Sequence, residues 1–152
     1  MTKTLLCPTR GGEASYPNQD QAIQMAKERD AHLIFLYVSN VHFLDLIAAP
    51  KVFDIEAELD EMGEFLLVMA QERAAKAGIE ADTIVRRGEF RETLKEVIDE
   101  YEITTVVLGA AGKETGLLTQ DYIDTLSEEL CSETGTEFIV VHQGEIVKFC
   151  TP

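Results

Sequence analysis

Short apolar runs alternate along this chain with longer segments that carry apolar residues at helical spacing, and this alternation limits the possible folds more than any other feature. The run HLIFLYV at 32–38 is almost continuously apolar, which is typical of a strand buried on both faces. We predict strands at 4–7, 32–38, 81–88, 103–112 and 137–142, and helices at 18–30, 53–77, 90–101 and 120–134. This order predicts an α/β fold, a three-layer Rossmann-like parallel sheet with helices on both faces.

The length of 152 residues suits a single domain with a core of ordinary size. The tail 143–152 contains EIVKF, which we interpret as a candidate sixth short strand. No apolar stretch approaches the roughly 20 residues that a membrane-spanning helix needs. The first residues lack the pattern of a signal peptide, so we expect a cytoplasmic protein.

The formal net charge of −15 argues against a nucleic acid or an anionic membrane as the partner, because both attract cationic surfaces. Cys7, Cys131 and Cys150 are far apart and form no CxxC pair. The sequence therefore predicts neither a zinc site nor a redox dithiol, and it predicts no other metal site.

Two glycine-containing loops follow predicted strands, and they are the main indication of a binding site. Gly11 and Gly12 come after the first strand, and Gly109 and Gly112 come at the end of the fourth. In parallel α/β sheets, ligands bind beyond the carboxyl ends of the strands. A glycine turn there lets backbone N–H groups approach a phosphate closely.

The segment VVLGAAGKETGLLTQDYIDTLSEEL resembles the strand, glycine turn and final helix of universal stress proteins, and RRGEFRETLKEVIDEYEITTVVLG resembles the part of that family which precedes them. The resemblance covers 3–142, so we expect a universal stress protein-like domain at 1–142, followed by the tail. It implies the strand order 3-2-1-4-5 and a homodimer, often paired through strand five. Some members of the family bind ATP and others do not.

The second loop matches the nucleotide-binding members of the family only in part. Gly109 and Gly112 match the first two glycines of the family's motif, and Lys113 is the cation of the spacer that follows. The family's Gly-Ser or Gly-Thr pair is missing at the usual spacing. A spacer longer by two residues would place Asp124 and Thr125 there, and a carboxylate at Asp124 would disfavour phosphate.

The first loop departs from the same pattern at its key position. Nucleotide-binding members usually carry an aspartate before this turn, but here Arg10 stands there, between Thr9 and Gly11. Val38 matches the position whose backbone usually meets adenine. The resemblance therefore implies a regulatory or stress-response module with a degenerate nucleotide site and weak or absent binding of ATP.

Two alternatives remain open at this stage. The first is a genuine ATP or AMP sensor that uses Gly109, Gly112 and Thr125, with Arg10 in a changed role. The second is an ATP-using enzyme of the PP-loop type, because RGGEAS shares two glycines and a serine with that group's loop. No arrangement of side chains predicts a catalytic base, so we expect no enzyme, or at most slow hydrolysis of ATP.

Overall fold

A single sheet of six strands organises the molecule, in the order β3-β2-β1-β4-β5-β6. The structure is a computed structural model that describes residues 3–9, 15–39, 49–109 and 120–152. Strands β1 to β5 run parallel, and β6 runs antiparallel to β5. The strands are β1 (Thr4–Pro8), β2 (His32–Ser39), β3 (Ala81–Arg87), β4 (Thr105–Gly109), β5 (Glu137–His142) and β6 (Glu145–Cys150).

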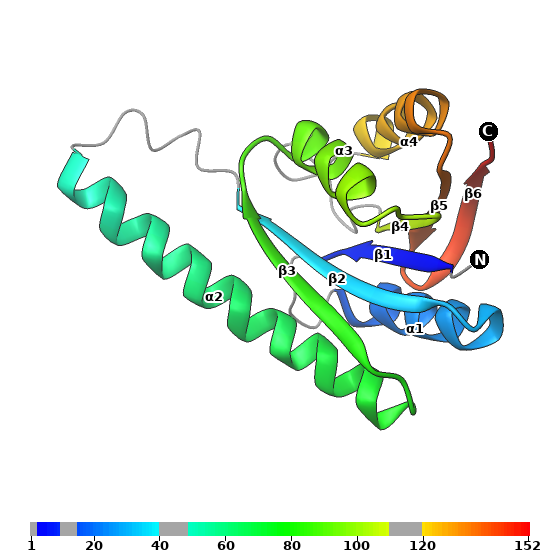
Figure 1. Cartoon of the computed structure of the whole chain (residues 1–152), viewed down its shortest axis with the longest axis horizontal. Coiled ribbons are helices and arrows are strands. Elements are labelled where there is room, and N and C mark those ends of the chain that lie inside the picture. The colour runs from blue at the N-terminus through cyan, green and yellow to red at the C-terminus, as the bar shows by residue number, and fades with distance from the viewer. Residues whose placement is uncertain (1–2, 10–14, 40–48, 110–119) are drawn as a thin grey trace.

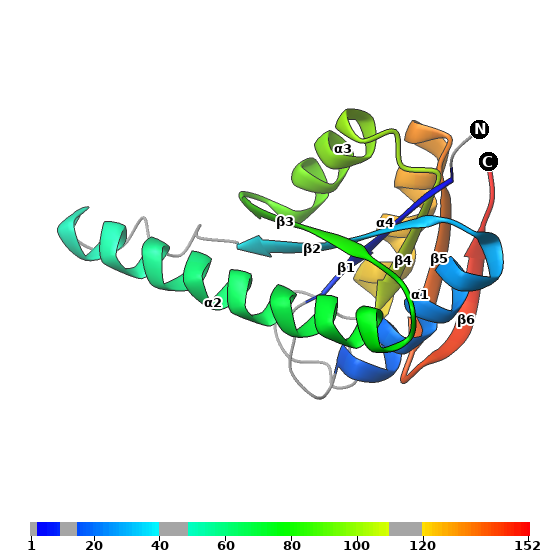
Figure 2. The same ribbon diagram turned by 60° about the horizontal axis from the view of Figure 1, so that its bottom comes forward.

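Helices cover both faces of the sheet, as Figures 1 and 2 show. On one face lie α1 (Tyr16–Arg29) and α2 (Ala49–Lys76), and on the other lie α3 (Phe90–Glu100) and α4 (Gln120–Thr134). The predicted α/β class and the order 3-2-1-4-5 of the parallel strands are thus confirmed. Within the described ranges, no helix has the length and apolar character needed to cross a membrane.

Side chains along each buried strand alternate between the two faces of the sheet, and this divides the core into two clusters. Successive side chains of a strand point to opposite faces, so Leu5 and Cys7 pack against α1 and α2, whereas Leu6 packs against α3 and α4. These side chains are almost completely buried. The strands are therefore apolar on both faces because each face lies under a pair of helices.

The predicted and observed bounds of the fourth strand differ at its amino end. The prediction was 103–112, but β4 covers only Thr105–Gly109. The backbone N–H of Ile103 donates to the carbonyl of Ile98 at 3.0 Å, so this residue closes the turn after α3 and does not extend the strand. Residues 110–112 lie outside the described part of the chain.

The tail contains β6, which forms a hairpin with β5 through the turn at Gln143 and Gly144. Both turn residues have positive φ angles, 52° and 85°, which is typical of the type I′ turns that join antiparallel strands tightly. Because β4 and β6 flank β5, no edge of β5 is open in the described sheet. A dimer paired through β5, as the family resemblance implies, would require β6 to move.

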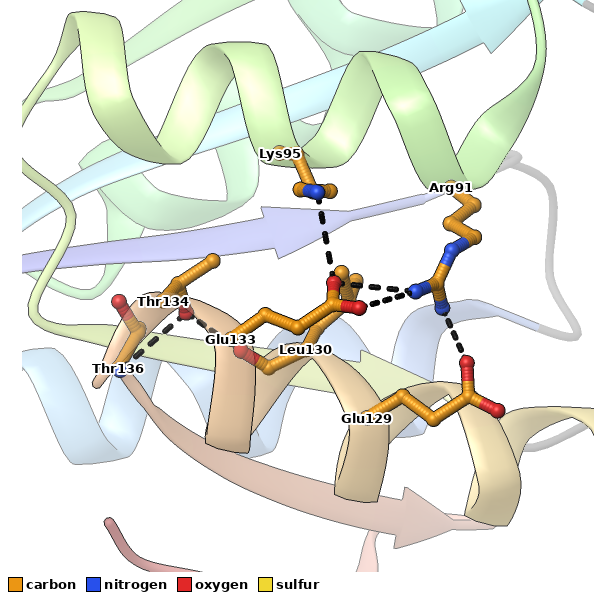
Figure 3. A network of polar contacts seen from close by, with 7 residues as sticks. All are labelled: Arg91, Lys95, Glu129, Leu130, Glu133, Thr134 and Thr136. Carbon is orange, nitrogen blue, oxygen red and sulfur yellow. Dashed lines mark hydrogen bonds and ion pairs between the residues drawn. The ribbon is translucent and has the colours of Figure 1, made fainter.

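Ion pairs join α3 to α4 on the outer surface of their face (Figure 3). Arg91 contacts Glu129 at 2.6 Å and Glu133 at 2.8 Å, and Lys95 contacts Glu133 at 3.4 Å. Exposed pairs of this kind contribute about 0–1 kcal/mol each, and more as a network. The ion pairs of Arg91 and Lys95 therefore help to hold α3 against α4.

Candidate functional site

The carboxyl ends of the parallel strands form the edge where a ligand of this fold would bind. At this edge β1 ends at Pro8, β2 at Ser39 and β4 at Gly109. We call it the carboxyl edge. Of the predicted site residues, Thr9, Val38, Gly109 and Thr125 lie in the described part of the chain, whereas Arg10, Gly11, Gly112 and Lys113 lie outside it.

Thr9 is fixed at this edge by contacts to β2 and α1. Its backbone N–H donates to the carbonyl of Leu36 at 2.8 Å, which continues the pairing of β1 with β2 by one residue. Its hydroxyl accepts a hydrogen bond from the side-chain N–H of Gln19 at 3.0 Å. Thr9 therefore joins the end of the first strand to the first turns of α1.

Gln19 and Ser39 bring two further polar atoms to the carboxyl edge, and neither was predicted from the sequence. The side chain of Gln19 is only 1% exposed, and Ser39 is only 4% exposed. Neither the amide oxygen of Gln19 nor the hydroxyl of Ser39 has a hydrogen-bond partner among the described residues. A buried polar atom without a partner costs about 1–3 kcal/mol, and Nδ1 of His142 at the end of β5 is a third such atom at this edge.

The peptide groups of Val38 point to the side of β2 on which β1 lies. The carbonyl of Leu36 points toward β1, and backbone groups two residues apart on a strand point to the same side. The carbonyl of Ser39 points the other way and accepts from Gly88 of the β3 side at 2.9 Å. The peptide groups of Val38 therefore point to the β1 side of β2, past Thr9, which is the last described residue of that segment.

Gly109 lies at the end of β4 in close contact with α1. A Cβ atom at this position would lie 2.6 Å from the amide nitrogen of Asn18, which is too close for any real contact. The amide oxygen of Asn18 in turn accepts a hydrogen bond from the N–H of Gly144 at 2.9 Å. A larger residue at 109 would therefore displace the side chain of Asn18, whether or not a phosphate binds.

Thr125 does not have the position that a phosphate-binding residue at a helix start would need. Helix α4 begins at Gln120, so Thr125 lies more than one turn inside it, and its side chain is exposed. Only the first four N–H groups of a helix are free of intrahelical bonds. Residues 124–125 therefore do not open the last helix, and a role for Thr125 at a phosphate stays a prediction.

The described groups at the ends of β1, β2 and β4 are polar but uncharged. Near the end of β3, Arg86 donates to Glu100 of α3 at 2.7 Å, so its charge is balanced within the protein. The last residue of β3 is Arg87, whose side chain is exposed. Neutral hydroxyl and amide groups suit the sugar or base of a ligand better than its phosphates. In the described ranges, no cluster of His, Cys, Asp or Glu has the arrangement of a metal site.

A cavity of about 390 Å³ opens at the other edge of the sheet, near the amino ends of β1, β2 and β3. Its lining includes Thr4, Tyr101 and the pair His32–Asp82, whose side chains contact each other at 2.7 Å. The imidazole and the carboxylate are both well exposed, which favours a solvated surface pair. We therefore place the candidate site at the carboxyl edge.

Comparisons with known proteins agree with this fold. The family model described as "Universal stress protein family" matches residues 1–119. The Universal stress protein YxiE of Bacillus subtilis is 28% identical over 120 residues, which is 74% of this chain and 81% of that protein.

Two solved structures are similar in fold. The structure of Universal stress protein UspA from Lactobacillus plantarum has a TM-score of 0.72 at 18% identity and covers 93% of this chain and 99% of its own. A universal stress protein in complex with cAMP has a TM-score of 0.67 at 22% identity and covers 93% and 97% of the two chains. The match of the family model over most of the sequence shows that this chain belongs to the universal stress protein family.

Proposed function

We propose that this protein is a regulatory module of the stress response whose nucleotide site is degenerate, so that ATP binds weakly or not at all. One observation carries the proposal: the described groups at the ends of β1, β2 and β4 are neutral, and Gly109 is explained by its contact with Asn18. The sequence adds Arg10 where nucleotide-binding members carry an acid, and it lacks their Gly-Ser or Gly-Thr pair. We propose that the protein has no catalytic activity.

A genuine sensor of ATP or AMP is the second candidate. The direction of the Val38 peptide groups and the unpartnered atoms of Gln19 and Ser39 favour it, because both would suit a nucleoside. A structural neighbour in complex with cAMP supports an adenine nucleotide as the class of ligand. The two candidates differ in how strongly the phosphates contribute to binding.

Calorimetric titration with Mg-ATP separates these candidates. For the degenerate site we expect a dissociation constant near 1 mM or a flat trace, which corresponds to about 4 kcal/mol of binding free energy or less. The phosphates of ATP would contribute little binding free energy, because the motif residues that hold them in nucleotide-binding members are missing. A dissociation constant of about 1 μM, or roughly 8 kcal/mol, would instead establish the sensor.

We also propose a homodimer that pairs through β6. This strand is the outermost of the described sheet on its side, so its outer backbone groups have no strand partner there. Val147 and Phe149 on it are 53% and 57% exposed, which is typical of a surface that another chain covers. A two-fold axis would bring two copies of β6 together antiparallel and extend the sheet across both protomers.

Light scattering should therefore give about twice the chain mass of 16.9 kDa. The substitution Phe149→Glu should reduce the measured mass to that of one chain, because it places a charge in the contact. Phe65→Glu is the matched control, since Phe65 is 65% exposed on α2 and lies far along the chain from β6. A wild-type mass of one chain, or dissociation caused by Phe65→Glu and not by Phe149→Glu, would refute this interface.

A further inference from the structure

Exposed large apolar side chains of the described residues gather mainly in two places. One is β6, which the proposed homodimer covers. The other is α2, where Met62, Phe65 and Val68 are 53%, 65% and 47% exposed. Residues three apart are neighbours on the surface of a helix, so these side chains follow one another along the outer side of α2. We call the three side chains the apolar stripe of α2.

The apolar stripe cannot turn toward the core, because the opposite side of α2 is fixed against the rest of the protein. A Cβ atom at Gly63 would lie 2.6 Å from the ring of Tyr37, so the helix backbone lies directly on β2 there. Further along α2, Arg73 forms an ion pair with Asp20 of α1. Its guanidinium carbon also lies 4.0 Å from the centre of the Tyr16 ring. The stripe is therefore a surface of fixed orientation.

Helix α2 is also longer than the sheet that it covers. Its 28 residues extend over about 42 Å, whereas the 7 residues of β3 extend over about 23 Å. Figures 1 and 2 show the amino-terminal part of α2 projecting past the ends of β2 and β3. This length offers several helical turns along which an elongated partner can lie.

The charge around the apolar stripe indicates what kind of partner fits it. Glu61, Glu64 and Glu72 lie beside the stripe with exposed side chains, and they form no ion pair within the described part of the chain. A second copy would bring the same carboxylates together, and each chain carries a net charge of −15. Self-association on this stripe is therefore disfavoured, whereas a cationic partner is attracted.

We propose that the apolar stripe of α2 binds a cationic amphipathic helix of a partner protein. The apolar face of that helix covers Phe65 and its two neighbours, and lysine or arginine residues beside that face pair with the glutamates. The apolar contact holds the two helices together, and the charges select the partner and accelerate its association. This interaction goes beyond the proposed function and does not depend on whether a nucleotide binds at the carboxyl edge.

The test measures the binding of synthetic helical peptides to the whole protein by fluorescence anisotropy at physiological salt. One peptide of about five helical turns has leucine along one face and lysine elsewhere, and a second has glutamate in place of lysine. We expect the leucine–lysine peptide to bind with a dissociation constant of about 10 μM, and the leucine–glutamate peptide not to bind. Neutralising the rim with Glu61→Gln and Glu72→Gln should weaken binding of the lysine peptide and reduce its dependence on salt.

Phe65→Ser tests the apolar part of the contact. It should weaken binding of the leucine–lysine peptide by about tenfold or more, equivalent to 1.4 kcal/mol, because it removes the most exposed ring of the stripe. Phe149→Ser is the matched control, since it makes the same change at an exposed phenylalanine of β6 and should leave the affinity for the peptide unchanged. Both side chains are exposed, so neither variant removes a part of the core.

A scrambled peptide of the same composition controls for the general attraction between a cationic peptide and an acidic protein. Equal binding of the scrambled peptide overturns the proposal, and so does wild-type affinity in Phe65→Ser, because charge alone then explains the binding. Equal binding of the leucine–glutamate peptide, or no binding of the leucine–lysine peptide, overturns it as well. A lower mass of Phe65→Ser in light scattering would show instead that the stripe is an interface between copies of this chain.

Discussion

Replacing Gly109 with alanine is expected to destabilise the fold by about 1–2 kcal/mol, although the residue lies at the candidate site and not in the centre of the core. The new Cβ would lie 2.6 Å from the amide nitrogen of Asn18. Asn18 cannot retreat without losing its hydrogen bond to the N–H of Gly144. The position for a Cβ on Gly144 is itself 3.1 Å from Pro17, so the hairpin turn also has little room to follow.

A double-mutant cycle in urea tests this account of Gly109. Asn18→Ala alone should cost about 1–2 kcal/mol, because it leaves the N–H of Gly144 without its acceptor. In the Asn18→Ala background, Gly109→Ala should cost much less than in the wild type, since the clash is gone. An interaction free energy below about 0.5 kcal/mol would mean that the two residues are independent and that the explanation is wrong.

This result bears on how the site is studied. A loss of nucleotide binding in Gly109→Ala would usually be assigned to a phosphate contact. Here the same substitution disturbs α1, β4 and the β5–β6 turn, because Asn18 links all three.

The stability of the protein is expected to fall at alkaline pH because of Cys7, with an effect of about 4 kcal/mol over the full titration. Complete burial raises the pKa of the Cys7 thiol from 9.0 to about 12. The unfolded chain therefore releases this proton first, as the pH rises above 9. Stability is fully present below pH 9 and declines by at most about 1.4 kcal/mol per pH unit until the folded thiol also ionises near pH 12.

Urea unfolding of the wild type and of Cys7→Ala at several pH values measures this contribution. Other groups ionise in both proteins alike, so the difference between their free energies of unfolding isolates the thiol. At pH 8 this difference reports the packing that is lost with the sulfur atom. Because only the wild type loses the contribution of the thiol above pH 9, the difference should be smaller by about 2 kcal/mol at pH 10.5. A difference that does not change with pH would contradict the burial of Cys7. The same burial keeps the thiol protonated at neutral pH, so Cys7 is no nucleophile beside the site.

The elements with uninterrupted patterns could be predicted well from the sequence. Helix α4 and strand β5 begin and end where the spacing of apolar residues indicates, at 120–134 and 137–142. Helix α2 begins at Ala49, earlier than the predicted residue 53. Pro50 explains the difference, because proline suggests a loop but is tolerated in the first turn of a helix, where its missing N–H has no partner to lose.

The candidate site could be predicted only as a location. The alternation of strands and helices places it at the carboxyl edge, and Thr9, Val38 and Gly109 are indeed found there. Gln19 and Ser39 carry no motif, since a glutamine early in a helix and a serine at the end of a strand are ordinary. Only the packing of α1 and β2 shows that both are buried and unpartnered. Pro17, in the first turn of α1, is a recognisable sequence feature near these residues, but it indicates the start of the helix and not a binding residue.

The central claim is that the nucleotide site at the carboxyl edge is degenerate, so that the phosphates of ATP add little to binding. The most direct test is to compare the affinities for adenosine and for Mg-ATP in one buffer by competition. We predict dissociation constants that agree within about threefold, a difference of less than about 1 kcal/mol. Mg-ATP that binds a hundredfold more tightly than adenosine, about 2.7 kcal/mol, would contradict the claim and show that the phosphate loops are functional.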